Sequence, residues 1–134
     1  MIRLRSRHIE AEHANKLNGP KPMESKKASG EKFLGGINHG HYIRLDAIDT
    51  DAVSKVTARV ATGGAGGIVE FRQGRVDGPI LAYVVVKENE GWEEFEDMTA
   101  DFANVNGVHD LFIVFANKEK PGGLMNLDSI YFHP

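Results

Sequence analysis

Short apolar or alternating segments, separated by clusters of Gly, Pro, Asn and Asp, recur along most of the chain. Residues 54–60 alternate most clearly: Val56, Ala58 and Val60 share one face, and Lys55, Thr57 and Arg59 share the other. A period of two is typical of a half-buried β-strand. The pattern predicts strands at 7–14, 32–37, 41–46, 54–61, 67–73, 80–87, 93–99, 109–116 and 124–133.

Segments 81–86 and 111–115 are apolar almost throughout. Such runs are typical of strands covered on both faces, so we expect both to be central strands. Helical signals are weak, and only residues 10–17 offer a helical alternative. The polar segment 19–30, with two prolines and three lysines, predicts a long surface loop.

Regularly spaced short strands with glycine-rich turns favour an all-β fold, a jelly-roll β-sandwich of two antiparallel sheets. No internal repeat or second domain is visible, so residues 1–134 are expected to form one domain. That length is sufficient to bury a hydrophobic core.

Composition argues against several functions. The net charge is −3 and the basic residues are scattered, so no nucleic-acid partner is expected. The absence of cysteine excludes disulfides, thiolate metal sites and a cysteine nucleophile. No apolar run approaches the roughly 20 residues of a membrane-spanning helix, and the basic first eight residues lack the apolar segment of a signal peptide.

Catalytic motifs are also missing. None of the five serines lies in a Gly-x-Ser-x-Gly context. A glycosidase needs two carboxylates about 5–10 Å apart, and no motif singles out such a pair. Glu93, Glu94 and Glu96 form the one acidic cluster beside a tryptophan, and we interpret it as an exposed strand edge.

Two further patterns have ordinary interpretations. His39 and His41, with His8 and His13, would suit a transition metal, but exposed loop histidines are favoured. The glycine run 63–67 lacks the Gly-Lys-Ser ending of a phosphate-binding loop. It predicts a hairpin turn that needs positive φ angles.

Six short segments occur in an order that resembles one family, carbohydrate-binding module family 6. They are 9–12 (Ile-Glu-Ala-Glu), 34–43, 58–67, Gly91-Trp92, 107–115 and 126–128 (Asn-Leu-Asp). The resemblance implies a jelly-roll sandwich that accompanies a catalytic domain in secreted bacterial polysaccharide-degrading enzymes. It implies a poly- or oligosaccharide partner, a covalently linked catalytic domain and a secreted or extracytoplasmic location.

The resemblance also implies a sugar site at the loop end of the sandwich, between two aromatic faces. Trp92 would supply one face and Asn126 would hydrogen-bond ring hydroxyls. Gly36 stands where the second aromatic is expected, and Asn38 replaces an aspartate two positions on. A missing wall removes about 1–2 kcal/mol of contact, so binding that is weaker, adapted to a wider or branched glycan, or lost altogether remains open. Tyr42 is expected to lie in the core.

A structural Ca²⁺ is the second implication, held by Glu10, Glu12 and Asp128. Strand alternation separately places Glu10 and Glu12 on one face, where like charges repel unless a cation lies between them. Calcium prefers six to eight hard oxygen ligands. The alternative is an ordinary solvated strand face.

The sequence therefore predicts a non-catalytic carbohydrate-binding module that holds an attached enzyme near a polysaccharide. Two alternatives remain: a structural or interaction β-sandwich that has lost glycan binding, and a glycosidase in its own right. Loops 15–30 and 118–123 are expected to set the sugar specificity.

Overall fold

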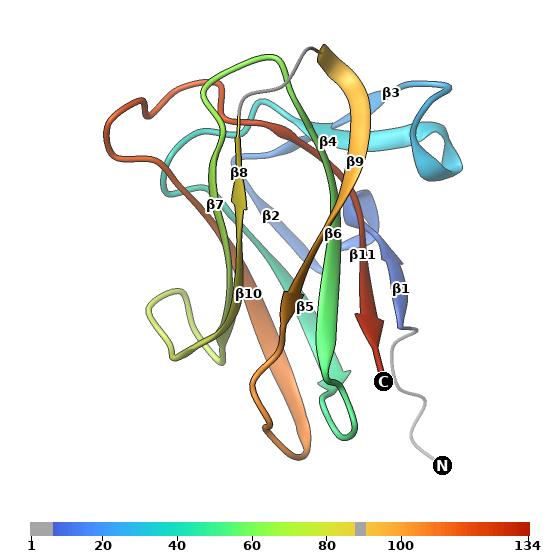
Figure 1. The fold of residues 1–134 in the computed structure, drawn as a ribbon, viewed down its shortest axis with the longest axis vertical. Coiled ribbons are helices and arrows are strands. Elements are labelled where there is room, and N and C mark those ends of the chain that lie inside the picture. The colour runs from blue at the N-terminus through green and yellow to red at the C-terminus, as the bar shows by residue number, and fades with distance from the viewer. Residues whose placement is uncertain (1–6, 88–90) are drawn as a thin grey trace.

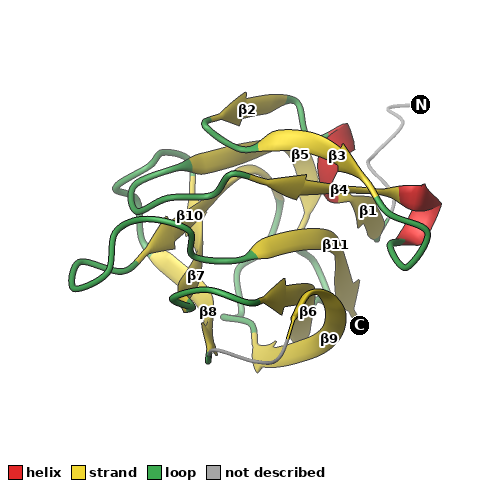
Figure 2. Cartoon of the chain, turned by 90° about the horizontal axis from the view of Figure 1, so that it is seen from above, coloured by secondary structure: helices red, strands yellow, loops and turns green. Residues whose placement is uncertain are grey.

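Two antiparallel sheets pack face to face in the computed structural model, which describes residues 7–87 and 91–134 (Figures 1 and 2). The six-stranded sheet has the order β3 (Lys21–Glu24), β4 (Lys32–Gly35), β11 (Asn126–His133), β6 (Lys55–Thr62), β9 (Gly91–Asp101), and β1 (His8–Glu10) also pairs with β11. The five-stranded sheet has the order β2 (Lys16–Asn18), β5 (Tyr42–Asp49), β10 (Val108–Ala116), β7 (Gly67–Gln73), β8 (Ile80–Val86). The predicted all-β sandwich is confirmed.

The helical content of the described residues is two short 3₁₀ turns, η1 (Ala11–His13) and η2 (Ser29–Glu31). Neither is long enough to span a membrane.

The core lies between the sheets and follows the predicted alternation. Val56, Ala58 and Val60 of β6 are buried, while Lys55 is exposed and Arg59 is partly exposed. Phe132 of β11 makes edge-to-face contacts with Phe71 and Phe102, with ring centroids 6.5 and 6.0 Å away. Because Phe71 belongs to β7, this aromatic contact joins the two sheets.

The N-terminal part of the chain differs from the prediction. The predicted strand 7–14 ends at Glu10 and continues as the turn η1. The predicted loop 19–30 contains β3, which pairs with β4 in a hairpin. All four β3 side chains are exposed, so no alternation marks it, and an edge strand tolerates Pro22.

Two further predictions are wrong. Segment 81–86 forms β8 at the edge of its sheet, where Tyr83 and Val85 are exposed, whereas β10 is central as expected. Tyr42 is half-buried on the outer face against Phe112 rather than in the core. An apolar or aromatic residue alone does not show whether a second layer covers it.

Strand β11 contains a bulge at Asp128. Leu127 pairs with Val60 of β6, whereas Ser129 pairs with Arg59, so one residue on β11 has no partner. A bulge shifts the side-chain alternation by one position. Leu127 therefore lies in phase with Ile130, and all residues from 126 to 130 are buried.

Replacing adjacent β11 residues tests this orientation. We expect Phe132→Ala to lower the free energy of unfolding by about 3–5 kcal/mol, because it leaves a cavity beside the rings of Phe71 and Phe102. The neighbouring Tyr131→Ala, on the exposed face, should cost about 1 kcal/mol or less. Urea denaturation of both variants measures the difference, and equal losses would contradict the assigned faces.

Candidate functional site

A groove of about 420 Å³ lies at the end of the sandwich where the β3–β4 hairpin meets the starts of β9 and β11. Its polar part is formed by two glutamates and one asparagine, and its apolar part by aromatic, aliphatic and thioether side chains. The lining residues are Met23, Glu24, Phe33, Gly36, Ile37, Trp92, Glu93, Gly123, Met125 and Asn126.

Trp92 reaches this groove because β9 leaves regular pairing with β6. Val60 pairs with Glu96, but Thr62 pairs with Gly91. An advance of two residues along β6 therefore corresponds to five residues along β9. The additional residues form an irregular segment, so the direction of the Trp92 side chain is not set by regular strand alternation. Its side chain is 44% exposed.

The Trp92 ring rests on the backbone of two glycines. A Cβ added at Gly63 would lie 2.7 Å from Nε1 of Trp92, and one at Gly64 would lie 2.5 Å from Cη2. Only glycine permits this close approach. The positive-φ turn predicted for this run is found at Gly66 and Gly67, whereas Gly63 and Gly64 support the tryptophan. Sequence analysis missed this role, because nothing local links residues 63–64 to residue 92.

Asn126 lies at the base of the groove and is 6% exposed. Its Nδ2 donates a hydrogen bond to the backbone oxygen of Trp92 at 2.7 Å. Its Oδ1 faces Gly35. Asn126 therefore fixes the backbone that carries Trp92, and the structure brings together these two residues from distant parts of the sequence.

Gly36 and Asn38 take different places. Gly36 lines the groove with φ +66°, and an added Cβ there would meet no atom within 4 Å. Asn38 is not among the lining residues: its Oδ1 accepts a hydrogen bond from the Gly123 backbone at 2.9 Å. Asn38 thus positions a loop residue that lines the groove.

The other candidate side chains have structural roles. His39 accepts a hydrogen bond from the Asn117 backbone through Nδ1 at 2.9 Å, and His41 accepts one from the Asn38 backbone at 3.0 Å. Glu93, Glu94 and Glu96 are exposed on the edge strand β9, as predicted.

Glu10, Glu12 and Asp128 meet beside the turn η2. An added Cβ at Gly30 would lie 3.5 Å from Glu10 Oε1 and 3.9 Å from Glu12 Oε2. Ser29 joins two of the carboxylates: its Oγ donates to Glu10 Oε1 at 2.7 Å, and its backbone N donates to Asp128 Oδ2 at 3.0 Å. Their proximity comes from the turn η1, not from the strand alternation expected for Glu10 and Glu12.

The electrostatics of this cluster favour a cation. Asp128 is fully buried and its Oδ2 lies 2.9 Å from Arg59 Nε. Burial, and secondarily the neighbouring carboxylates, raise the pKa of Glu12 and of Asp128. One oxygen of each carboxylate is buried without a hydrogen-bond partner: Glu10 Oε2, Glu12 Oε1 and Asp128 Oδ1.

These orphaned oxygens match calcium in kind, since they are hard, anionic and shielded from water. As they stand, however, no three His, Cys, Asp or Glu side chains among the described residues form a group that could hold a metal ion.

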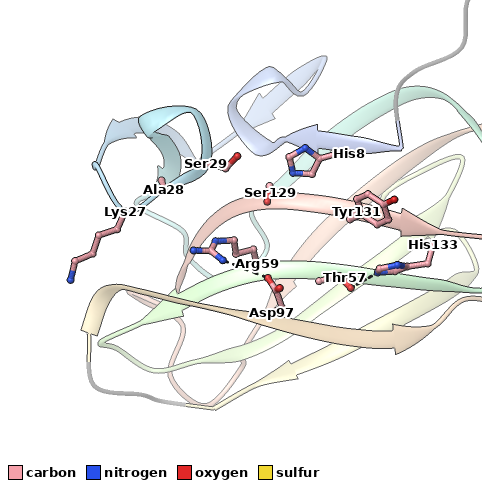
Figure 3. Close-up of a pocket in the computed structure, with 10 residues that line it drawn as sticks. All are labelled: His8, Lys27, Ala28, Ser29, Thr57, Arg59, Asp97, Ser129, Tyr131 and His133. Carbon is pink, nitrogen blue, oxygen red and sulfur yellow. Dashed lines mark hydrogen bonds and ion pairs between the residues drawn. The ribbon is translucent and has the colours of Figure 1, made fainter.

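A larger, polar hollow of about 640 Å³ lies on the outer face of the six-stranded sheet (Figure 3). Its lining includes His8, Tyr131 and His133 (Figure 3). Ser29 and Arg59 also line it, and both contact the carboxylate cluster. Thr57 Oγ1 and His133 Nε2 are hydrogen-bonded at 2.6 Å.

Residues 10–134 match the family described as carbohydrate binding module (family 6). The chain belongs to this family. It is therefore a non-catalytic carbohydrate-binding module of the kind that accompanies glycoside hydrolases, in agreement with the sequence prediction.

Two similar proteins of known function illustrate the context. The module is 29% identical over 127 residues to endo-1,4-beta-xylanase A of Thermoclostridium stercorarium. The aligned region covers 94% of this chain and 18% of the xylanase. It is 30% identical over 117 residues to arabinoxylan arabinofuranohydrolase of Paenibacillus polymyxa, covering 83% of this chain and 18% of that enzyme. The chain thus spans about a fifth of the length of these relatives.

Solved structures agree with the fold. A family 6 module of Clostridium cellulolyticum in complex with xylose superposes with a TM-score of 0.87 at 26% identity, covering 95% of this chain and 96% of that one. A β-1,3-glucan-binding module of Bacillus halodurans gives the same TM-score and identity, with 95% of each chain covered.

Gly64→Ala tests the packing beneath Trp92. The new methyl group collides with the ring and with the backbone oxygen of Gly123. We expect a loss of about 1–3 kcal/mol in the free energy of unfolding and a shifted tryptophan emission maximum, because Trp92 is the only tryptophan. Gly122→Ala is the control, since its Cβ would meet only Asn38 Oδ1 at 3.9 Å. Unchanged emission from Gly64→Ala would contradict this packing.

Proposed function

We propose that the module binds a poly- or oligosaccharide in the Trp92 groove. The exposed Trp92 side chain, which lines one groove with the Asn126 amide, carries this proposal. A sugar ring packs its C–H face against an aromatic face, while its hydroxyls need hydrogen-bond partners. The groove supplies both. Ligands named for similar modules are xylose, β-1,3-glucan and cellobiose, which favours a β-linked chain.

The greater length of the relatives supports a tethering role. The module would be part of a longer, secreted bacterial enzyme and would hold its catalytic domain close to the polysaccharide. Tethering raises the effective concentration of substrate without new chemistry. A rival role, a structural or interaction domain without glycan binding, is favoured only by the open side at Gly36.

A structural calcium is the second part of the proposal. Glu10, Glu12 and Asp128 would hold the ion through their orphaned oxygens. The ion would neutralise carboxylates whose ionisation is opposed by burial and mutual repulsion. Since these residues connect β1, η1 and β11, calcium would stabilise the N-terminal edge of the six-stranded sheet.

Trp92→Ala tests the sugar site. Titration with xylohexaose, laminarihexaose and cellohexaose should change the fluorescence of the unmodified module with at least one of them. We expect Trp92→Ala to lower that affinity, measured by calorimetry, by tenfold or more, because a stacked aromatic contributes about 1.5 kcal/mol or more. Tyr131→Ala is the matched control, because its exposed ring lies outside this groove, and should bind normally. No response to any of the three sugars would favour the structural role.

Glu12→Gln tests the ion. We expect the melting temperature of the unmodified module to rise by about 3 °C or more when millimolar Ca²⁺ replaces EDTA. The variant should lose that response. In EDTA it should melt at or above the unmodified module, because Gln removes a carboxylate whose charge the fold disfavours. A melting temperature unaffected by Ca²⁺ would exclude the ion.

A further inference from the structure

We infer that Met23 forms the second wall of the groove, and that the groove selects xylan chains with neutral side groups. This inference rests on the proposed sugar binding at Trp92.

Exposure singles out Met23. Among the ten lining residues, the buried apolar ones are Phe33, Ile37 and Met125, at 5%, 1% and 1% exposure. They form the floor. Met23 and Trp92 are the exposed large apolar side chains, at 42% and 44%.

Met23 and Trp92 reach the two ends of the Asn126 amide. Nδ2 of Asn126 points to the Trp92 backbone. Oδ1 of Asn126 and Sδ of Met23 both lie close to Gly35, 3.1 and 2.6 Å from the position of an added Cβ. The Met23 thioether therefore lies on the Oδ1 side of the amide and the Trp92 backbone on the Nδ2 side, and Gly35 leaves room for the thioether.

A methionine wall differs chemically from an aromatic one. Its thioether is apolar and polarisable, so it can contact the C–H face of a sugar. Its three rotatable side-chain bonds let it adapt to irregular shapes. Beside it, Gly36 presents open space and no side chain. Together they give room for a substituent on the bound sugar.

Charge sets the second limit on the ligand. The groove contains the carboxylates of Glu24 and Glu93 and no Lys, Arg or His among its lining residues. Exposed carboxylates disfavour an anionic ligand at low ionic strength. Neutral substituents such as arabinose are therefore accepted, and glucuronate is disfavoured. The similar xylanase and arabinoxylan arabinofuranohydrolase support a xylan backbone.

Met23 variants test the wall by calorimetric titration with xylohexaose. We expect Met23→Ala to bind about fivefold more weakly, and Met23→Leu to stay within about twofold, since Leu keeps most of the apolar contact. Ile80→Ala, an equally exposed apolar residue on β8, is the control and should bind normally. Normal affinity in Met23→Ala with binding lost in Trp92→Ala would overturn the wall and leave the proposed function intact.

Substituted probes test the ligand class. The unmodified module should bind an arabinose-branched xylo-oligosaccharide within about threefold of xylohexaose, and a glucuronate-branched one at least fivefold more weakly at low salt. Glu24→Gln with Glu93→Gln should bring the glucuronate-branched probe within about twofold of xylohexaose, with both affinities measured on that variant. Equal binding of both branched probes, or binding of laminarihexaose without xylohexaose, would overturn the assigned class.

Gly36→Tyr tests the open side. A side chain there should reduce affinity for the arabinose-branched probe more than for xylohexaose. Gly36→Asn is the second variant, for the case that the Gly36→Tyr protein does not fold. Asn tolerates the positive φ angle at this position better than Tyr. Thermal melts verify that both are folded. Equal effects on the two probes would contradict an open flank at Gly36.

Discussion

The bulge at Asp128 is the constraint on which both proposed sites depend. One unpaired residue in β11 keeps Leu127 in phase with the core and buries Asp128 beside Ser29 and Arg59. Two positions earlier, the same strand places Asn126 under Trp92. The sugar groove and the carboxylate cluster therefore share one strand whose position is fixed by pairing with β1, β4 and β6.

Different interactions dominate at the sugar groove and at the carboxylate cluster. At the groove, close packing dominates: Trp92 lies on glycine backbone and is held through its own carbonyl oxygen, which keeps one aromatic face available to a ligand. At the carboxylate cluster, electrostatics dominates. A fully buried Asp128 has Arg59 on one oxygen and no partner on the other, and leaving such an oxygen unpaired costs stability. A bound cation would offset that cost.

Sequence reasoning succeeded where local pattern and chemistry agree. The β6 alternation identified its buried face, and the Gly91-Trp92 pair and Asn126 marked residues that the structure brings together. It failed where a partner decides the outcome. An exposed four-residue strand, β3, carries no alternation of its own and exists because β4 pairs with it. The apolar β8 looks central but has no strand beyond it.

The sequence by itself determined the all-β sandwich, the family and the residue types available for sugar and calcium. Strand periodicity and ordered short motifs are local properties, so they can be read without coordinates. Only the tertiary structure decided that Gly63 and Gly64 support Trp92 and that Met23 flanks Asn126. It also decided that Asn38, which is outside the groove lining, holds the lining residue Gly123. Those contacts join residues far apart in the chain, and their distances depend on how the sheets and loops pack.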